Sequence, residues 1–515
     1  MKEKLLSALQ KKPYFLVLLP LFFIAHGYND FFGFFPFQFV LLNFIAALFG
    51  AAALYLLAAA LFRKKEKNAL FAFWLLLIIL VFGTIHDLLK KMFNAGFFSS
   101  YTFLLSFLLL LVVLLLIFLK KRKSLFARSF QFQNLLFLFL ISYELIDGIR
   151  LFSKFKKGSN FLDSRFNTFN NFTPQNQVPD SAKPDIYFLV FDAMPSTKAM
   201  KTSWNYDNSS LDSFLLNENF YISHDSKSNY NLTVLSISST LNMDYTPPVD
   251  LYQDETKMYF KASSSITDNS LTRILRKEGY SIYQYQSISF TNKDWDGNLF
   301  FSDMLYMNYF YKTLPGRIYR DLGWNLSRLN LKVIDDFTFW KYAKRNKQAE
   351  HDLHTTVDLV KSSCSINKIK PQFVYAHFQL PHDPYVFDST GKRKATEKTI
   401  LLTEADQQQA FIDQIKFANR LIEELVSYIK TNNKKNTVII LEGDHGYRNI
   451  YGEKGYMIFD NLNSIYYPDG AYETLYPSIS PVNSFRSVLN KFFASNLPLL
   501  KDSSIFIPYT LPGEK

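Results

Sequence analysis

Hydrophobic and polar residues are distributed very unevenly along this chain of 515 residues. Up to about residue 152 the sequence is a series of Leu-, Phe- and Ala-rich runs, and beyond it Ser, Asn, Asp and Tyr become frequent. A helix that crosses a bilayer needs about 20 predominantly apolar residues. Five stretches approach that length, near 13–27, 37–62, 69–87, 101–119 and 131–149. We therefore predict a transmembrane domain of about five helices over residues 1–152.

The basic residues between these stretches predict the orientation of the bundle. Lys and Arg cluster before the first stretch, after the second and after the fourth, whereas the loop after the first has none. Positively charged loops stay in the cytoplasm, so the N-terminus is expected there, and five spans place the following domain outside. Glu144 and Asp147 lie within the fifth stretch, and Arg150 begins a basic segment after it. Without that span the domain would be cytoplasmic.

The second part of the chain has the pattern of a globular α/β domain. Residues 153–183 are polar and rich in Asn, Ser and Pro without periodicity, which predicts a linker. Between 184 and 515 short β-rich runs alternate with amphipathic segments such as Thr403 to Thr431. Four runs are typical of buried strands, at 186–191, 281–285, 373–378 and 437–441. Strands separated by helices predict an α/β fold with a mainly parallel sheet.

Charge and cysteine content exclude two classes of protein. The formal net charge is +12, but residues 1–157 hold 19 Lys and Arg against 6 Asp and Glu, and the remainder has a balance of −1. The basicity therefore accompanies the predicted spans, and no nucleic-acid partner is expected. Cys364 is the only cysteine. A single thiol cannot form an internal disulfide, and it does not provide the cysteine cluster of a structural zinc site.

Residues suited to metal chemistry follow the predicted strands. Asp192 follows the first strand, Asp444 and His445 follow the last, and Thr233 directly precedes the helical-looking segment 234–241. Taken singly, these residues are also ordinary turn formers and helix caps. Parallel sheets, however, place their sites at the carboxyl ends of strands. Together the residues suit a divalent cation that lowers the pKa of the Thr hydroxyl and polarises a phosphoryl oxygen.

In this order the motifs resemble the sulfatase-like branch of the alkaline phosphatase superfamily. Within it, the chain looks most like the membrane-anchored lipoteichoic acid synthases and phosphoethanolamine transferases of bacterial envelopes. The resemblance covers about residues 184–495, and the five preceding spans match it too. It implies a three-layer α/β/α catalytic domain, held at the outer, periplasmic face of a bacterial cytoplasmic (inner) membrane by a multi-pass anchor.

The resemblance also implies roles for single residues. Asp192, Asp444 and His445 match the family's metal ligands, and Thr233 matches its metal-bound nucleophile. The loop at 380–385 resembles one that contacts substrate phosphate. Three residues are thereby implied in substrate binding: His382, His377 as a second choice, and Trp295 in a segment like the substrate groove of the synthases.

Two departures from the family narrow the chemistry. No Cys or Ser stands in the C/S-x-P-x-R motif that true sulfatases need, so sulfate-ester hydrolysis by that route is not expected. No His follows His445, which favours one metal ion. The mixed Asp, Thr and His ligand set favours Mn or Zn and is compatible with Mg or Ca.

The favoured hypothesis is a metal-dependent phospho-group transferase acting at the membrane surface. It takes a phosphoethanolamine- or phosphoglycerol-type headgroup from a membrane phospholipid donor, carries it on Thr233 and passes it to an envelope glycan or lipid acceptor. Two alternatives remain open at this point. One is a phosphodiester or phosphomonoester hydrolase with the same residues, and the other is a non-catalytic envelope assembly protein.

Overall fold

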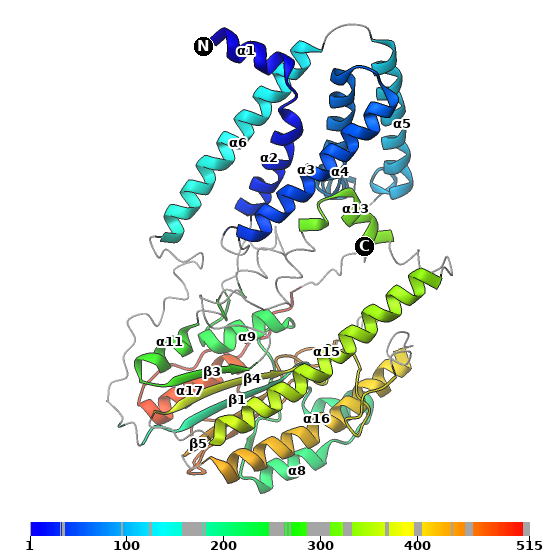
Figure 1. Cartoon of the computed structure of the whole chain (residues 1–515). Helices are drawn as coiled ribbons and strands as arrows, with labels where there is room; N and C mark the ends of the chain where they lie inside the picture. Colours follow the sequence, from blue (N-terminus) through cyan, green and yellow to red (C-terminus); the bar gives the residue numbers. More distant parts are fainter. Residues whose placement is uncertain are drawn as a thin grey trace. The chain divides into compact units, whose positions relative to one another are not determined.

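A computed structural model of the chain describes 2–30, 32, 37–93, 96–122, 126–156, 179, 182–246, 262, 265–266, 269–285, 309–322, 332–365, 370–395, 404–433, 436–448 and 457–507. It divides into two compact units (Figure 1). The helical unit comprises Met1–Asn160, Gly297–Leu331 and Tyr509–Lys515, and the sheet unit comprises Phe161–Asp296 and Lys332–Pro508. Residues 157–178 of the predicted linker, and Trp295, lie outside the described residues.

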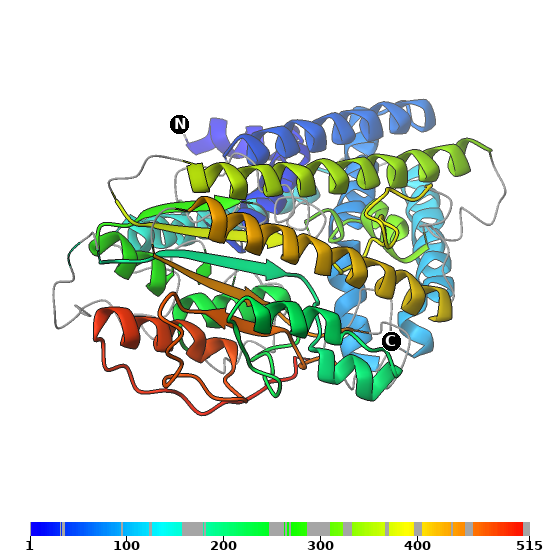
Figure 2. The same cartoon turned by 90° about the horizontal axis from the view of Figure 1, so that it is seen from below.

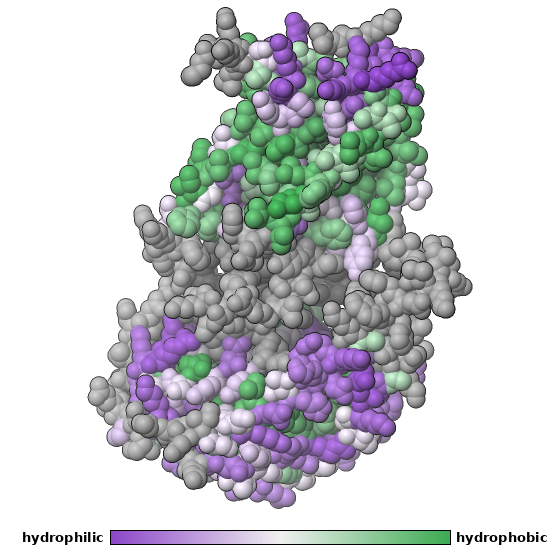
Figure 3. Space-filling model, viewed as in Figure 1, coloured by the Kyte–Doolittle hydropathy of each residue, from purple (hydrophilic) through white to green (hydrophobic). Residues whose placement is uncertain are grey.

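The helical unit contains helices at all five predicted stretches. Its elements are α1 (Lys2–Lys11), α2 (Phe15–Asp30), α3 (Phe37–Leu61), α4 (Lys65–Phe93), η1 (Phe97–Ser99), α5 (Tyr101–Lys121) and α6 (Ala127–Lys156). Among the described residues, three helices are long and apolar enough to cross a membrane: Val40–Leu61, α4 and α5. The surface of this unit is hydrophobic over its middle, with hydrophilic residues at the end near the N-terminus (Figure 3). That the chain crosses the membrane five times stays a prediction.

Polar side chains of α6 pair with the first two helices. The Asn134 side chain accepts a hydrogen bond from the Phe15 backbone N–H at 2.8 Å and donates to the Leu9 carbonyl at 2.8 Å. The Glu144 carboxylate, which lies within the fifth predicted span, accepts from the Asn29 amide at 2.8 Å and lies 2.9 Å from His26 Nδ1. Polar groups at membrane depth need such partners, so Glu144 is compatible with a helix packed in the bundle.

The sheet unit is built on one mixed six-stranded sheet. Its strands are β1 (Asp185–Phe191), β2 (Tyr221–Ile222), β3 (Ser281–Tyr285), β4 (Gln372–Phe378), β5 (Thr437–Glu442) and β6 (Asn463–Tyr466). The order is β2-β6-β5-β1-β4-β3, with the four strands from β5 to β3 parallel and β2 and β6 in antiparallel pairs. All four predicted strands and the mainly parallel sheet are confirmed. Every residue of β1 is buried, as expected for a parallel strand covered on both faces.

Helices cover both faces of this sheet (Figures 1 and 2). The helices are α7 (Thr197–Trp204), α8 (Ser209–Asn217), α9 (Thr233–Asn242), α11 (Ser270–Lys277), α15 (Lys332–Ser365), α16 (Glu404–Asn432) and α17 (Pro481–Phe493). Tyr187, Leu189 and Phe191 of β1 share a core with α15 and α16. Phe188, which points to the other face, packs edge-on against Phe485 of α17 at 5.1 Å. Alternate side chains of β1 therefore enter two different hydrophobic cores, one on each face of the sheet.

Removing the Phe485 ring tests this second core. Phe485 is fully buried, and Phe→Ala at such a position costs about 3–5 kcal/mol. We expect Phe485→Ala to lower the unfolding temperature of the detergent-purified chain markedly, as followed by Trp fluorescence. Leu216→Ala, at a side chain that is 57% exposed, is the matched control and should change stability by no more than about 0.5 kcal/mol. Equal effects of the two changes would contradict the assigned packing.

Candidate metal centre

The ends of β1 and β5 bring two aspartates together. The strands are parallel neighbours in a register that pairs Val190 with Glu442, so Asp192 and Asp444 follow at the same level. The backbone N–H of Ala193 donates to Asp444 Oδ1 at 2.9 Å. Ala193 has a φ of 64°, a left-handed conformation that is uncommon for a residue with a side chain. This turn holds the Asp444 carboxylate beside that of Asp192.

His445 presents one ring nitrogen to the two carboxylates. Its Nδ1 lies 2.7 Å from the Gly446 carbonyl, so Nδ1 carries the proton and Nε2 is left with a free lone pair. Nε2 lies 3.6 Å from Asp192 Oδ1 and 3.5 Å from Asp444 Oδ2. The Gly446 backbone passes so close to its neighbours that an added Cβ would lie 1.7 Å from the Met457 carbonyl oxygen. Only glycine therefore permits this turn.

Helix α9 brings the predicted nucleophile to the same point. Thr233 is the first residue of α9, and its Oγ1 lies 3.3 Å from His445 Nε2. The Ser236 hydroxyl, one turn later, donates to the Asp444 backbone carbonyl and fastens the helix to the strand end. The partial positive charge at the helix N-terminus favours an oxyanion at Thr233.

Two further histidines approach Asp192 from β4 and the loop that follows it. His377 Nε2 lies 3.6 Å from Asp192 Oδ2, and His377 Nδ1 lies 2.9 Å from the Tyr375 hydroxyl. His382 donates its backbone N–H to the Asp192 carbonyl at 3.1 Å, and its Nδ1 lies 2.7 Å from the Asp383 carbonyl. Two of the three residues predicted to contact substrate, His377 and His382, therefore lie at the candidate metal centre.

The charges of these groups are set by their neighbours. Burial raises the pKa of Asp192, but His382, His377 and His445 outweigh it and hold that pKa well below its usual value. Burial and Arg448 lower the pKa of His445 to about 4, so its Nε2 is free at neutral pH. Burial lowers the pKa of His382, but Asp192 and Asp383 outweigh it and the pKa is raised. A charged carboxylate and a neutral imidazole are the forms that bind metal.

The arrangement fits a divalent metal ion. Two sets of three ligand atoms lie within 4.8 Å of one another, Asp192–His382–His445 and Asp192–His377–Asp444. Within the described part of the chain, Asp192 Oδ1 and Asp444 Oδ2 are buried and have no hydrogen-bond partner. A buried carboxylate oxygen without a partner is costly, and a cation would satisfy both. Oxygen and imidazole donors together suit Zn or Mn.

One residue of the cluster was not anticipated from the sequence. Arg448 Nη2 lies 2.9 Å from His382 Nε2, and Nη1 donates to the Asn231 carbonyl at 3.3 Å. The signal was its position two residues beyond Gly446, which puts a guanidinium next to the predicted metal ligands. Of the predicted site residues, Asp192, Thr233, His377, His382, Asp444 and His445 come together, and Trp295 is not described.

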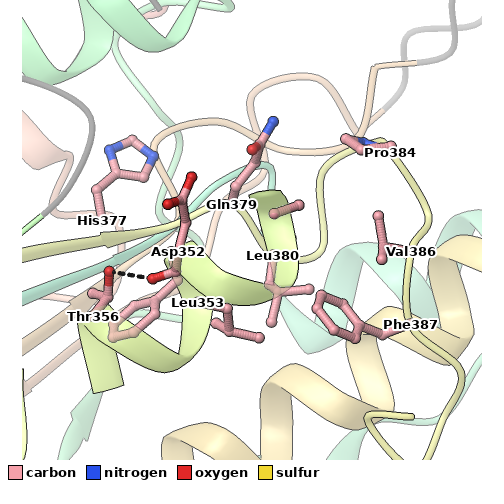
Figure 4. A pocket seen from close by; sticks show the side chains of 11 residues that line it. Asp352, Leu353, Thr356, His377, Gln379, Leu380, Pro384, Val386 and Phe387 are labelled. Atoms are coloured by element: carbon pink, nitrogen blue, oxygen red, sulfur yellow. Dashed lines mark hydrogen bonds between the residues drawn. The ribbon is translucent and has the colours of Figure 1, made fainter. Parts of the chain in front are cut away.

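A separate small pocket lies between α15 and the loop after β4 (Figure 4). It is lined by Ala349, Asp352, Leu353, Thr356, His377, Phe378, Gln379, Leu380, Pro384, Val386 and Phe387. Of the predicted site residues only His377 is among them, and the side chains between Leu380 and Phe387 that line it are apolar. We therefore place the reacting groups at the carboxylate–histidine cluster and not in this pocket.

Several solved structures resemble the chain at low sequence identity. The C-terminal periplasmic domain of EcEptC from Escherichia coli is 10% identical, with 66% of this chain and 95% of that one covered and a TM-score of 0.39. Lipooligosaccharide phosphoethanolamine transferase A from Neisseria meningitidis is 11% identical, with 95% of each chain covered and a TM-score of 0.37. The putative sulfatase yidJ from Bacteroides fragilis is 11% identical, with 63% and 77% covered and a TM-score of 0.36.

Sequence comparison gives the family. No curated protein matches the chain. The family profile described as Sulfatase matches residues 194–479, a range that contains Thr233, the loop with His382, and the Asp444–His445 pair. Because this match spans more than half of the 515 residues, the chain belongs to the sulfatase family.

Proposed function

We propose that the chain is a membrane-anchored, metal-dependent phospho-group transferase that carries the transferred group on Thr233. The observation that carries the proposal is the position of Thr233 Oγ1. This oxygen stands at the first turn of α9, 3.3 Å from His445 Nε2. The same Nε2 lies 3.6 Å from Asp192 Oδ1 and 3.5 Å from Asp444 Oδ2, two buried oxygens without hydrogen-bond partners among the described residues. A hydroxyl in that setting is an activated nucleophile.

Asp192, Thr233, Asp444 and His445 would hold the metal ion, with Zn or Mn preferred. When bound, the ion lowers the pKa of the Thr233 hydroxyl and neutralises charge on a phosphoryl oxygen. The two aspartates contribute a charge of −2, which offsets the ion, and His445 contributes a neutral nitrogen. The chain's own arrangement of charges thus suits one divalent cation.

The chain's residues divide the transfer into two steps. In the first, Thr233 Oγ1 loses its proton to solvent and attacks the headgroup phosphorus, the bond from phosphorus to the lipid oxygen breaks, and His382 protonates that oxygen. In the second, a hydroxyl of the acceptor gives its proton to His382 and attacks phosphorus, the bond to Oγ1 breaks, and Oγ1 takes up a proton from solvent. Diacylglycerol leaves after the first step, and the acceptor carries the phospho-group after the second.

Arg448 and His382 would hold the phosphate between them. Arg448 can donate to His382 Nε2 only while that ring is neutral, whereas Asp192 and Asp383 favour the charged ring. A phosphate oxygen is a better partner for the guanidinium, so its arrival would release Nε2 to take up a proton. Substrate binding would then prepare His382 as the acid of the first step.

A phospholipid is the proposed donor because the same chain carries three helices that can cross a membrane. The headgroup is of the phosphoethanolamine or phosphoglycerol type, and the acceptor is an envelope glycan or lipid. The distribution of Lys and Arg supports an N-terminus in the cytoplasm and a catalytic unit on the periplasmic side of a bacterial inner membrane.

Metal binding should depend on Asp444. Asp444→Asn keeps the shape of the side chain and removes its charge, and we expect the affinity for Zn²⁺ or Mn²⁺ to fall by at least about 100-fold, the upper range for losing a residue that merely supports a ligand. Titration of the metal-stripped full chain, followed by mass spectrometry of bound metal, measures this. Asp225→Asn, at an aspartate 49% exposed and paired with Lys198, is the control and should bind as the unaltered chain does.

Thr233 should become covalently modified. The intact mass of the full chain, after incubation with Mn²⁺ or Zn²⁺ and mixed bacterial phospholipids, should increase by one phospho-group. Thr233→Ala should abolish the adduct, whereas Thr233→Ser keeps the hydroxyl and should retain it. An adduct that survives in Thr233→Ala would overturn the assigned nucleophile. Consumption of lipid with release of the free phospho-group to water, with or without an acceptor glycan, would indicate a hydrolase.

Arg448 is expected to contribute to phosphate binding and not to metal binding. We expect Arg448→Gln to slow adduct formation by about 100-fold, the usual cost of one lost donor at a developing charge, with bound metal unchanged. Arg420→Gln, which removes an exposed arginine of α16, should leave the rate unchanged. If the two variants react at the same rate, Arg448 is no phosphate ligand.

A further inference from the structure

A short segment from the middle of the sequence belongs to the helical unit. Tyr309–Leu322 lies between β3 and α15 in the sequence, yet it packs with the N-terminal helices. It contains α13 (Leu314–Arg317) and the single turn η4 (Ile318–Leu322). Figure 1 shows α13 beside α4, and contacts between α13 and α4 agree with this. We call residues 309–322 the docked segment.

The docked segment is fastened to the backbone of α4 at Gly83. The Gly83 N–H donates to the Lys312 carbonyl at 2.8 Å, and Arg317 Nη2 donates to the Gly83 carbonyl at 3.2 Å. Arg317 also pairs with Asp87, one turn further along α4, and is only 2% exposed. A Cβ on Gly83 would lie 2.4 Å from the Tyr311 carbonyl oxygen, so no side chain fits there.

Other helices of the unit contribute further contacts. The Tyr101 hydroxyl at the start of α5 pairs with the Asp321 carboxylate. The Tyr309 ring lies 5.3 Å from the Phe23 ring of α2, and its hydroxyl donates to the Phe23 carbonyl at 3.4 Å. The segment is therefore held in the helical unit by specific contacts with α2, α4 and α5.

The length of α4 gives an expected membrane depth for the attachment point. Gly83 is 18 residues beyond Lys65, the first residue of α4, which is about 27 Å at 1.5 Å per residue. The hydrocarbon core of a bilayer is about 30 Å thick. If Lys65 marks one boundary, Gly83 and the docked segment lie at the other, on the side that the distribution of Lys and Arg assigns to the periplasm.

Three apolar or aromatic side chains of the docked segment are partly exposed. Phe310, Ile318 and Tyr319 are 39%, 37% and 45% exposed although their neighbour Arg317 is buried. At the same end of the helical unit, Met92 and Phe97 are 64% and 68% exposed. The Phe310 and Tyr319 rings lie 6.4 Å apart and form, with Ile318, an exposed hydrophobic patch, which needs an apolar neighbour.

We propose that the docked segment is a lipid-contacting element, with Phe310, Ile318 and Tyr319 in the headgroup–acyl boundary of the leaflet at the Gly83 end of α4. Aromatic side chains accumulate at this depth because one part of the ring system is apolar and the other meets water. The occupant of the patch is thus phospholipid of that leaflet, and the polar docking contacts keep the segment from leaving the boundary. Its Lys312 side chain adds a positive charge suited to anionic headgroups.

The depth of Tyr319 tests this proposal in the full chain. A nitroxide label is placed on Tyr319→Cys in a Cys364→Ser background, and the protein is reconstituted into vesicles of phosphatidylethanolamine and phosphatidylglycerol. Relaxation by oxygen and by a water-soluble nickel complex then reports the depth. Leu114→Cys, in the middle of α5 and 52% exposed, and Lys198→Cys, 63% exposed on the sheet unit, supply the lipid and water references.

We expect the label at 319 to be shielded from nickel and accessible to oxygen, at a depth between the two references and nearer the lipid one. A label at 319 as accessible to nickel as that at 198 would overturn the proposal.

A matched pair of glycine variants tests the docking contact. Gly83→Ala should free the segment and expose the label at 319 to nickel, whereas Gly50→Ala, where an added Cβ meets nothing within 4 Å, should leave it shielded. The label at 114 must stay at its depth in both variants, which shows that the bundle is intact. If it moves in Gly83→Ala, Arg317→Gln replaces that variant and carries the same expectation. An unchanged depth at 319 would show that these contacts do not hold the segment.

Discussion

Two carboxylates, Asp192 and Asp444, meet at the end of a sheet that is buried on both faces, and their mutual repulsion is the constraint on which the catalytic unit depends. Like charges so close together are unfavourable unless positive groups surround them. Three imidazoles, the Ala193 N–H and the N-terminus of α9 all point toward this place. A divalent cation would complete the balance of charge. The same carboxylates therefore explain why the proposed nucleophile, the histidines and Arg448 converge there.

The histidines differ in charge because their surroundings differ. His445 is fully buried next to Arg448, and both lower its pKa, so the ring is neutral and Nε2 carries no proton. His382 is partly exposed beside Asp383 and Asp192, which favour its protonated form. In each ring a backbone carbonyl near Nδ1 directs Nε2 toward the site. Environment thus gives two residues of the same type different charges, as the proposed roles of His445 in metal binding and His382 in proton transfer require.

In the helical unit the polar side chains serve to join elements through their backbones. Asn134 bonds to the Phe15 N–H, Asn29 bonds to the Glu144 carbonyl and side chain, and Arg317 bonds to the Gly83 carbonyl. A polar group that faces lipid without a hydrogen-bond partner raises the free energy of the protein. These side chains find their partners on neighbouring helices, so the pairing requires the assembled bundle. Charges within the predicted fifth span are consequently compatible with a helix there, since Glu144 has partners.

The sequence alone determined the parts of this protein that depend on local pattern. Buried parallel strands such as Ile186–Phe191 are continuous apolar runs, and residues directly after them lie at the sheet edge, so the strands, α16 and the cluster of Asp192, Thr233, Asp444 and His445 could be predicted. The tertiary structure alone decided that Arg448 meets His382 and that the docked segment returns to α4. Those contacts run through backbone groups and single polar side chains far apart in sequence. They leave no periodic signal, because a hydrogen bond to Gly83 depends on close approach and not on hydrophobicity.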